Sequence, residues 1–197
     1  MATIGISKPY YAVYANNDGT VSYSGGGVLG KATEANITIN TTDANNLYAD
    51  NAIAESDKSF ADGTFTVATD DLSQEVSKAI LGLKEEAIGA IDGVSDTDVK
   101  ELIYDDEQNI PYLGVGIIVK KKVNGEFRWR GIILTKIMFS IPADAATTQG
   151  ESIQWQVPSL TATIMRDDSA THIWKREATF TTEAQAEAYI KNRLAVA

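Results

Sequence analysis

The chain has 197 residues, enough for one domain of ordinary size, and 44% of them are hydrophobic, as in a folded globular protein. It contains no cysteine, which excludes disulfide bonds, thiolate metal sites and cysteine nucleophiles. Its 17 basic and 27 acidic residues give a net charge of −10, which disfavours binding to another polyanion such as nucleic acid.

The charge is unevenly distributed along the chain. Residues 1–118 hold 6 basic and 19 acidic side chains, a balance of −13, whereas residues 119–197 hold 11 and 8, a balance of +3. Two interpretations are open. The two halves attract each other head to tail between copies, or both simply have solvated faces.

In chain order, the first predicted element is a β-hairpin. Its strands, residues 10–15 and 20–24, are aromatic or β-branched and flank a turn of Asn, Asp and Gly. Residues 34–40 and 64–69 then alternate apolar and polar side chains, which predicts two strands with one buried face each.

The glycine-rich stretch 25–32 has the spacing of a phosphate-binding loop, ending in Gly30-Lys31. However, Ala32 stands where such a loop has Ser or Thr, and the next predicted element is a strand rather than a helix. We therefore interpret this stretch as a turn.

Residues 41–62 lack clean periodicity and predict a long extended loop between two good strands. Yet they contain Leu47, Tyr48, Ile53 and Phe60, apolar side chains that a solvated linker does not need. An arm that docks on a neighbouring copy explains both the length and these anchors. The alternative is a loop that folds back over its own sheet.

A helix is predicted over residues 70–82. Ser73 is a suitable N-cap, apolar residues follow at helical spacing, and Gly82 is a natural stop. A second helix is predicted within residues 181–197, where Thr182 and Gln185 form a capping box ahead of one apolar stripe.

Between the helices, residues 114–139 predict a long β-hairpin around an Asn124-Gly125 turn. Counting back from that turn places Lys122 opposite Phe127 and Lys120 opposite Trp129. Further strands are predicted at residues 152–157, 161–166 and 171–180. Together these elements predict a mainly β single domain over residues 1–197, a β-sandwich or open barrel with two short peripheral helices.

We find no pattern of catalytic residues and predict that the chain is not an enzyme and binds no metal or cofactor. The single histidine, His172, falls in a predicted strand without partners at the spacing of a triad or metal site. The acids at 105–107 lack the spacing of a calcium loop, and Asp167-Asp168 is typical of a turn. The N-terminus predicts no secretory signal, and no apolar run is long enough to span a membrane.

Several ordered blocks nevertheless resemble a known family. They are SKPYYAVY, NLYADNAIAESDKSFADGTFTVATDDLSQEVSKAILG, IYDDEQNIPYLGVGIIVKKKVNGEFRWRGIIL and TTQGESIQWQVPSLTATIMRDDSATHIWKRE. In these stretches the chain resembles the major tail protein, the tail-tube subunit, of siphophages and prophages of Gram-positive bacteria. Residues 84–100 are the least similar, so we expect a variable turn or small insertion there.

The resemblance implies a tail-tube fold of two packed β-sheets with a flanking helix and an extended loop. It implies rings, usually hexameric, that stack into the hollow tail tube of a virion assembled in the host cytoplasm. The implied partners are other copies of the chain, a tape-measure protein, and the tail terminator and distal tail proteins at the tube ends. DNA would pass through the lumen without specific binding, and a ring of six copies would carry roughly −60 charges.

For assembly contacts, two sets of residues are candidates. On the 41–62 arm they are Leu47, Tyr48, Asp50, Asn51, Ile53 and Phe60. On the predicted hairpin they are Lys121, Arg128 and Arg130, which we expect to face neighbouring subunits.

The main alternative is a carbohydrate-binding β-sandwich, as in an adhesin or a virion decoration module. Its sugar platforms would be Trp129, Trp155 and Trp174, if their rings are exposed. Because all three alternate with polar neighbours, we expect at least two of them to be part of the core.

Overall fold

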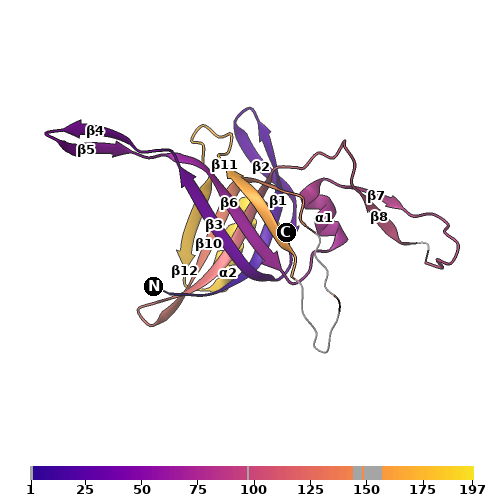
Figure 1. Ribbon diagram of the computed structural model, residues 1–197. Coiled ribbons are helices and arrows are strands. Elements are labelled where there is room, and N and C mark those ends of the chain that lie inside the picture. Colours follow the sequence, from indigo (N-terminus) through magenta and orange to yellow (C-terminus); the bar gives the residue numbers. More distant parts are fainter. Residues whose placement is uncertain (1, 97, 144–147, 149–156) are drawn as a thin grey trace.

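A computed structural model describes residues 2–96, 98–143, 148 and 157–197. Within these residues the chain forms one eight-stranded sheet, two two-stranded sheets and two helices (Figure 1). The strands of the main sheet are β1 (Ala2–Asn17), β2 (Thr20–Val28), β3 (Ala32–Thr41), β6 (Phe60–Thr69), β9 (Leu113–Val123), β10 (Glu126–Phe139), β11 (Ser159–Met165) and β12 (Lys175–Phe180). The small sheets pair β4 (Asn45–Ala49) with β5 (Ala52–Asp57), and β7 (Lys84–Ala87) with β8 (Lys100–Ile103); the helices are α1 (Gln74–Leu81) and α2 (Glu183–Leu194).

The main sheet runs in the order β2-β1-β9-β10-β11-β6-β3, with β12 also paired to β10. Strand β10 changes partner along its length: Trp129–Leu134 pair with β12, and Lys136–Phe139 pair with β11. The sheet is not closed, because no ladder among the described residues joins its end strands β2 and β3. The predicted mainly β class with two helices is therefore confirmed. Where the resemblance implies two packed sheets, the chain has one continuous sheet, because β10 belongs to both parts of it.

The main core lies on one face of this sheet, and Ile80 and Leu81 of α1 contribute to it. Strands β9 and β10 contribute Val115 and Leu134, which are 1% exposed, and β6 contributes the fully buried Phe65. The ring of Phe65 lies 6.5 Å from that of Phe139. The predicted inward direction of Phe65 and Val67 is confirmed, whereas Ile37 and Ile39 are only partly buried at the edge strand β3.

Helix α2 packs on the opposite face of β9 because that strand presents glycines to it. A Cβ atom on Gly116 would lie 2.3 Å from Cγ2 of Ile190, and one on Gly114 would lie 2.8 Å from Cδ2 of Leu194. Ile190 and Leu194 are both fully buried there. The Gly-Val-Gly run of β9 thus places small residues toward the helix and Val115 toward the main core.

The long hairpin has the predicted register. Lys122 pairs with Phe127 and Lys120 pairs with Trp129 across the Asn124-Gly125 turn. The ammonium group of Lys120 lies 4.3 Å from the ring centroid of Phe127 and 5.6 Å from that of Trp129, within the range of a cation–π contact.

Both helices have the predicted caps. The Ser73 hydroxyl accepts a hydrogen bond from the Val76 N–H, and the Thr182 hydroxyl accepts one from the Gln185 N–H. Gly82 adopts the left-handed conformation, with φ of 65°, that ends α1.

Two predictions in the C-terminal third need correction. The strand predicted at 171–180 begins only at Lys175, and His172 lies in a turn with φ of 49°. The cause is Asp167, whose buried carboxylate accepts the N–H groups of Ser169 and Ile173 and so curls the chain before β12. The strand predicted at 152–157 falls, except for its last residue, outside the described residues.

Candidate assembly surfaces

The 41–62 segment forms a β-hairpin that extends β3 and β6 beyond the main sheet. Strand β4 pairs with β5, and the turn residues Asp50 and Asn51 have φ values of 49° and 62°. The predicted irregular loop was therefore wrong in its local structure. The signal for the turn was the Asp-Asn pair itself, since both residue types tolerate positive φ.

Figure 1 shows this hairpin projecting away from the body of the molecule, which contradicts the alternative in which the segment folds back over its own sheet. The side chain of Leu47 is 60% exposed. Tyr48 and Ile53 lie in β4 and β5, and their side chains lie outside the described part of the structure. A two-stranded hairpin without a covered face is marginally stable in water.

Phe60, at the base of the hairpin, has a different environment from the one predicted. Its ring stacks on that of Trp174 at a centroid distance of 4.6 Å and an interplanar angle of 9°. The guanidinium group of Arg166 lies 5.7 Å from the centroid of the same ring. Phe60 thus packs within its own chain at the root of the hairpin, and its role as an intersubunit anchor stays a prediction.

A second hairpin, β7–β8, projects from the other side of the molecule in Figure 1 and spans residues 84–100, where we expect a variable turn or small insertion. Its base is fixed by ion pairs. Glu85 accepts from Lys100 at 2.6 Å and from Lys78 of α1 at 3.3 Å. Lys84 donates to Asp105 at 2.6 Å and to Glu107 at 3.1 Å, so the acids at 105–107 form a turn that a lysine partly neutralises.

The three cations predicted for assembly on the β9–β10 hairpin are not equivalent. Arg130 is ion-paired with Glu177 of β12, and its Nε is buried without a hydrogen-bond partner among the described residues. Arg128 pairs with Glu126 at 2.5 Å, on its own strand. Lys121 makes no ion pair among the described residues and is the one of the three that has no partner there.

Glu177 links β10 to β12 and is the carboxylate whose titration is most perturbed. Hydrogen bonds from Lys175, at 2.7 Å, and from Arg130 lower the pKa of Glu177 to about 2. The charged form of Glu177 is therefore favoured in the folded chain. Arg130 makes an intrachain ion pair with it, and the role of Arg130 in assembly stays a prediction.

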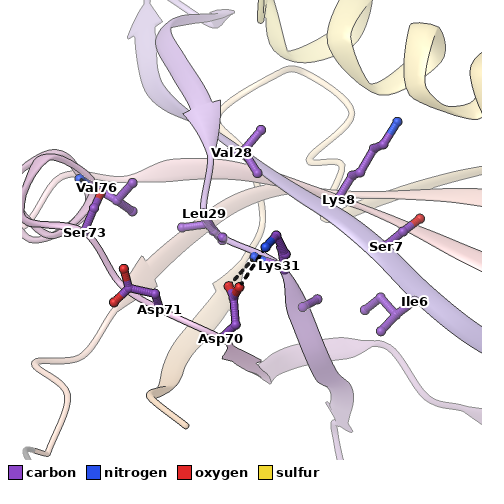
Figure 2. A pocket seen from close by; sticks show the side chains of 12 residues that line it. Ile6, Ser7, Lys8, Val28, Leu29, Lys31, Asp70, Asp71, Ser73 and Val76 are labelled. Carbon is purple, nitrogen blue, oxygen red and sulfur yellow. Dashed lines mark hydrogen bonds and ion pairs between the residues drawn. The ribbon is translucent and has the colours of Figure 1, made fainter.

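A hollow of about 540 Å³ lies between the start of β1, the β2–β3 turn and the N-terminus of α1 (Figure 2). Asp70 accepts a hydrogen bond from the backbone N–H of Lys31 at 2.9 Å and pairs with its ammonium group at 3.5 Å. The backbone bond is the main reason that the pKa of Asp70 lies below its usual range. The prediction that the glycine-rich stretch 25–32 is a turn was only partly right: residues 25–28 belong to β2, and only residues 29–31 connect it to β3. The wall of the hollow carries two carboxylates, Asp70 and Asp71, and two ammonium groups, Lys8 and Lys31, so its charge does not favour phosphate.

In the described part of the chain, no group of three or more His, Asp or Glu side chains is arranged to hold a metal ion. The His172 ring contacts the Asp167 carbonyl oxygen, with Nδ1 at 3.2 Å. No helix among the described residues is long and apolar enough to cross a membrane.

Two of the three tryptophans lie within the described residues. Both are partly buried, so neither belongs to the fully buried core expected for at least two of the three. Trp174 is covered on one face by Phe60. Trp129 is partly buried and packs against the α2 side of the sheet. Trp155 lies outside the described residues.

The chain was also compared with known proteins. No model of a protein family matches it, and no curated protein sequence matches it.

Proposed function

We propose that this chain is a structural subunit that assembles with copies of itself into stacked rings, and that these rings form the tail tube of a long-tailed bacteriophage. The observation that carries the proposal is the β4–β5 hairpin. It leaves the body of the molecule, and the exposed Leu47 on it has no cover within the described residues. Such a hairpin gains most from a partner surface that buries it.

The open sheet supports the same proposal. Strand β3 has a partner on one side only, among the described residues, and β2 likewise. A free strand edge presents unpaired N–H and C=O groups, which can pair with another chain. Neighbouring copies would cover such edges in a ring.

The charge of the chain fits a conduit for DNA. A lumen lined by a protein of net charge −10 repels the phosphate backbone, and a DNA molecule would then slide without binding. The proposed further partners are a tape-measure protein inside the tube and the terminator and distal proteins at its ends. The proposed location is the virion tail, after assembly in the host cytoplasm.

The sequence resemblance agrees with this function in four ordered blocks, which cover most of the chain. The mainly β class and the projecting 41–62 segment fit it as well. No observation in the structure favours the carbohydrate-binding alternative, because the Trp129 and Trp174 rings pack against neighbours in the same chain.

Negative-stain electron microscopy of the purified chain over a range of concentrations tests the proposal. The expected result is rings and hollow filaments that lengthen as the concentration rises. A field of separate small particles at every concentration, together with binding of the monomer to a glycan array, would favour the alternative.

A further inference from the structure

The loop of the β7–β8 hairpin is acidic and unpaired. Residues 86–99, which we call the acidic knob, contain no Lys or Arg. Among the described residues, none of the knob's carboxylates makes an ion pair. These acids are Glu86, Asp92, Asp96 and Asp98.

The acidic knob also carries aliphatic side chains in solvent. Ile91 is 50% exposed, Val94 is 42% exposed and Val99 is 40% exposed. A loop that only had to be solvated would not need three large aliphatic residues within nine positions. Apolar side chains ringed by charges of one sign are typical of a surface that meets a partner.

The turn end of the β9–β10 hairpin has the opposite character. Residues 119–130, which we call the basic tip, hold five cations and one acid, Glu126. Lys120, Lys121 and Lys122 make no ion pair among the described residues. Beside them the ring of Phe127 is 46% exposed, with the ammonium group of Lys122 5.9 Å from its centroid. The basic tip thus combines free positive charge with an exposed apolar ring.

These two surfaces lie apart in the molecule. Ion pairs from Lys78 and Lys100 to Glu85 fix the base of the knob, and ladder bonds of the main sheet fix the base of the tip. In Figure 1 the turn that joins β9 to β10 and the β7–β8 hairpin lie at opposite ends of the molecule. The knob therefore has no access to the tip of its own chain, and only a second copy can bring the two together.

We propose that the acidic knob of one copy docks on the basic tip of the next, with Ile91 and Val94 against Phe127 and the free carboxylates against Lys120 and Lys122, which lie on the same face of the hairpin as that ring. This contact is head to tail, so it propagates from copy to copy and either closes into a ring or continues as a filament. The inference rests on the proposed self-assembly and adds to it the two surfaces that meet.

Charge reversal on each side tests the contact in the full-length chain. One variant carries Asp92→Lys and Asp96→Lys, and the other carries Lys120→Glu and Lys122→Glu. Each places like charges in the contact, so light scattering at a fixed concentration should show an assembled fraction reduced by at least about tenfold. An equimolar mixture of the two variants restores both opposite-charge contacts, and its scattering should recover toward that of the unmodified chain.

The control for acidity in general carries Asp92→Ala and Asp96→Ala together with Asp43→Lys. Its knob therefore lacks the two tested carboxylates, and its new lysine lies on the segment that leads into β4. It should not restore assembly when mixed with the Lys120→Glu, Lys122→Glu variant. Circular dichroism checks that each exposed-site variant is folded. If a variant is not folded, the unmodified chain still gives an answer, because raising the salt from about 0.05 M to 0.5 M should reduce its scattering through this contact.

The outcomes separate the inference from the proposed function. If the unmodified chain forms tubes and the reversed variants form them equally well, or if the mixture stays dissociated, the knob–tip contact is wrong and the tube function stands. If the control restores assembly as well as the knob variant does, the partner of the basic tip is the β4–β5 region, and the inference is overturned. An unmodified chain that never assembles overturns both.

Discussion

The body of the molecule and its two projecting hairpins differ in what holds them in place. The body has an apolar core with fully buried side chains such as Phe65, Ile80 and Ile164, and α2 seals its other face. None of the described side chains in β4, β5, β7 or β8 is buried. The body can account for its own stability, whereas the hairpins depend on a few ion pairs, on strand pairing and on whatever they contact outside the chain.

This difference indicates that the body determines the stability of the chain and the hairpins determine its assembly. Substitutions in the body should reduce the free energy of unfolding and affect assembly only as a consequence. Substitutions on the hairpins should affect assembly and leave the free energy of unfolding almost unchanged. The following experiments test whether stability and assembly depend on different regions, from the largest expected effect on stability to the smallest.

Removing the Phe65 ring should have the largest effect. Phe65 is fully buried against Phe139, so Phe65→Ala leaves a cavity and should lower the free energy of unfolding by about 3–5 kcal/mol. Chemical denaturation measures this loss in the free energy of unfolding. The matched control is Phe127→Ala, whose ring is 46% exposed and which should cost less than about 1 kcal/mol. Equal losses at the two positions would contradict the separation of body and surface.

Adding one methyl group at the α2 contact should have an intermediate effect. The new Cβ in Gly116→Ala would lie 2.3 Å from Ile190, so the helix must shift, at a cost of about 1–3 kcal/mol in the free energy of unfolding. At Gly5 a Cβ meets nothing within 4 Å, so Gly5→Ala should change stability by less than about 0.5 kcal/mol. A Gly116→Ala variant as stable as the unmodified chain would mean that α2 does not pack as described.

The Glu177 ion pairs give a smaller, pH-dependent effect. The pKa of Glu177 is lowered to about 2 in the folded chain, so its contribution is complete above its ordinary pKa of 4.5 and is lost as the pH falls from there toward 2. Because this side chain is 46% exposed, the contribution should be under about 1 kcal/mol.

Glu177→Gln removes that titration. In denaturation series between pH 5 and pH 2, stability should fall less steeply for this variant than for the unmodified chain. Parallel slopes for the two proteins would show that Glu177 is not held in its charged form by Lys175 and Arg130.

The smallest effect on stability is expected at the tip of the β4–β5 hairpin. Leu47 is 60% exposed, so Leu47→Ser should change the free energy of unfolding by less than about 0.5 kcal/mol. The same variant should assemble less than the unmodified chain, as measured by light scattering, because it removes apolar surface from the contact. Leu47→Met keeps that surface and should assemble normally. If the Ser and Met variants assemble equally, Leu47 is not an anchor.

Much of the body could be predicted from the sequence because its signals are local. The Asn124-Gly125 turn sets the register of β9 and β10, so the Lys120–Trp129 pair follows by counting. Capping residues such as Ser73 and Thr182 likewise identify the starts of the helices within a few positions. In each case, neighbouring residues in the sequence determine the geometry.

The sequence was least informative where a contact between residues far apart in the chain decides the environment of a side chain. From the sequence, Phe60 resembles a free anchor. In the structure its ring stacks on Trp174, which is far away in the sequence. From the sequence, Arg130 resembles a free cation. In the structure the pairing of β10 with β12 places Glu177 beside it. The alternation of residues 171–174 suggests a strand, but the buried Asp167 carboxylate turns the chain there instead.

Sedimentation velocity of the unmodified chain over a wide concentration range most directly tests the central claim. That claim is that identical copies cover the projecting hairpins and the free strand edges. If they do, the sedimenting mass grows with concentration, from single chains to rings and then to longer tubes. One species with the mass of a single chain at every concentration would contradict assembly by identical copies.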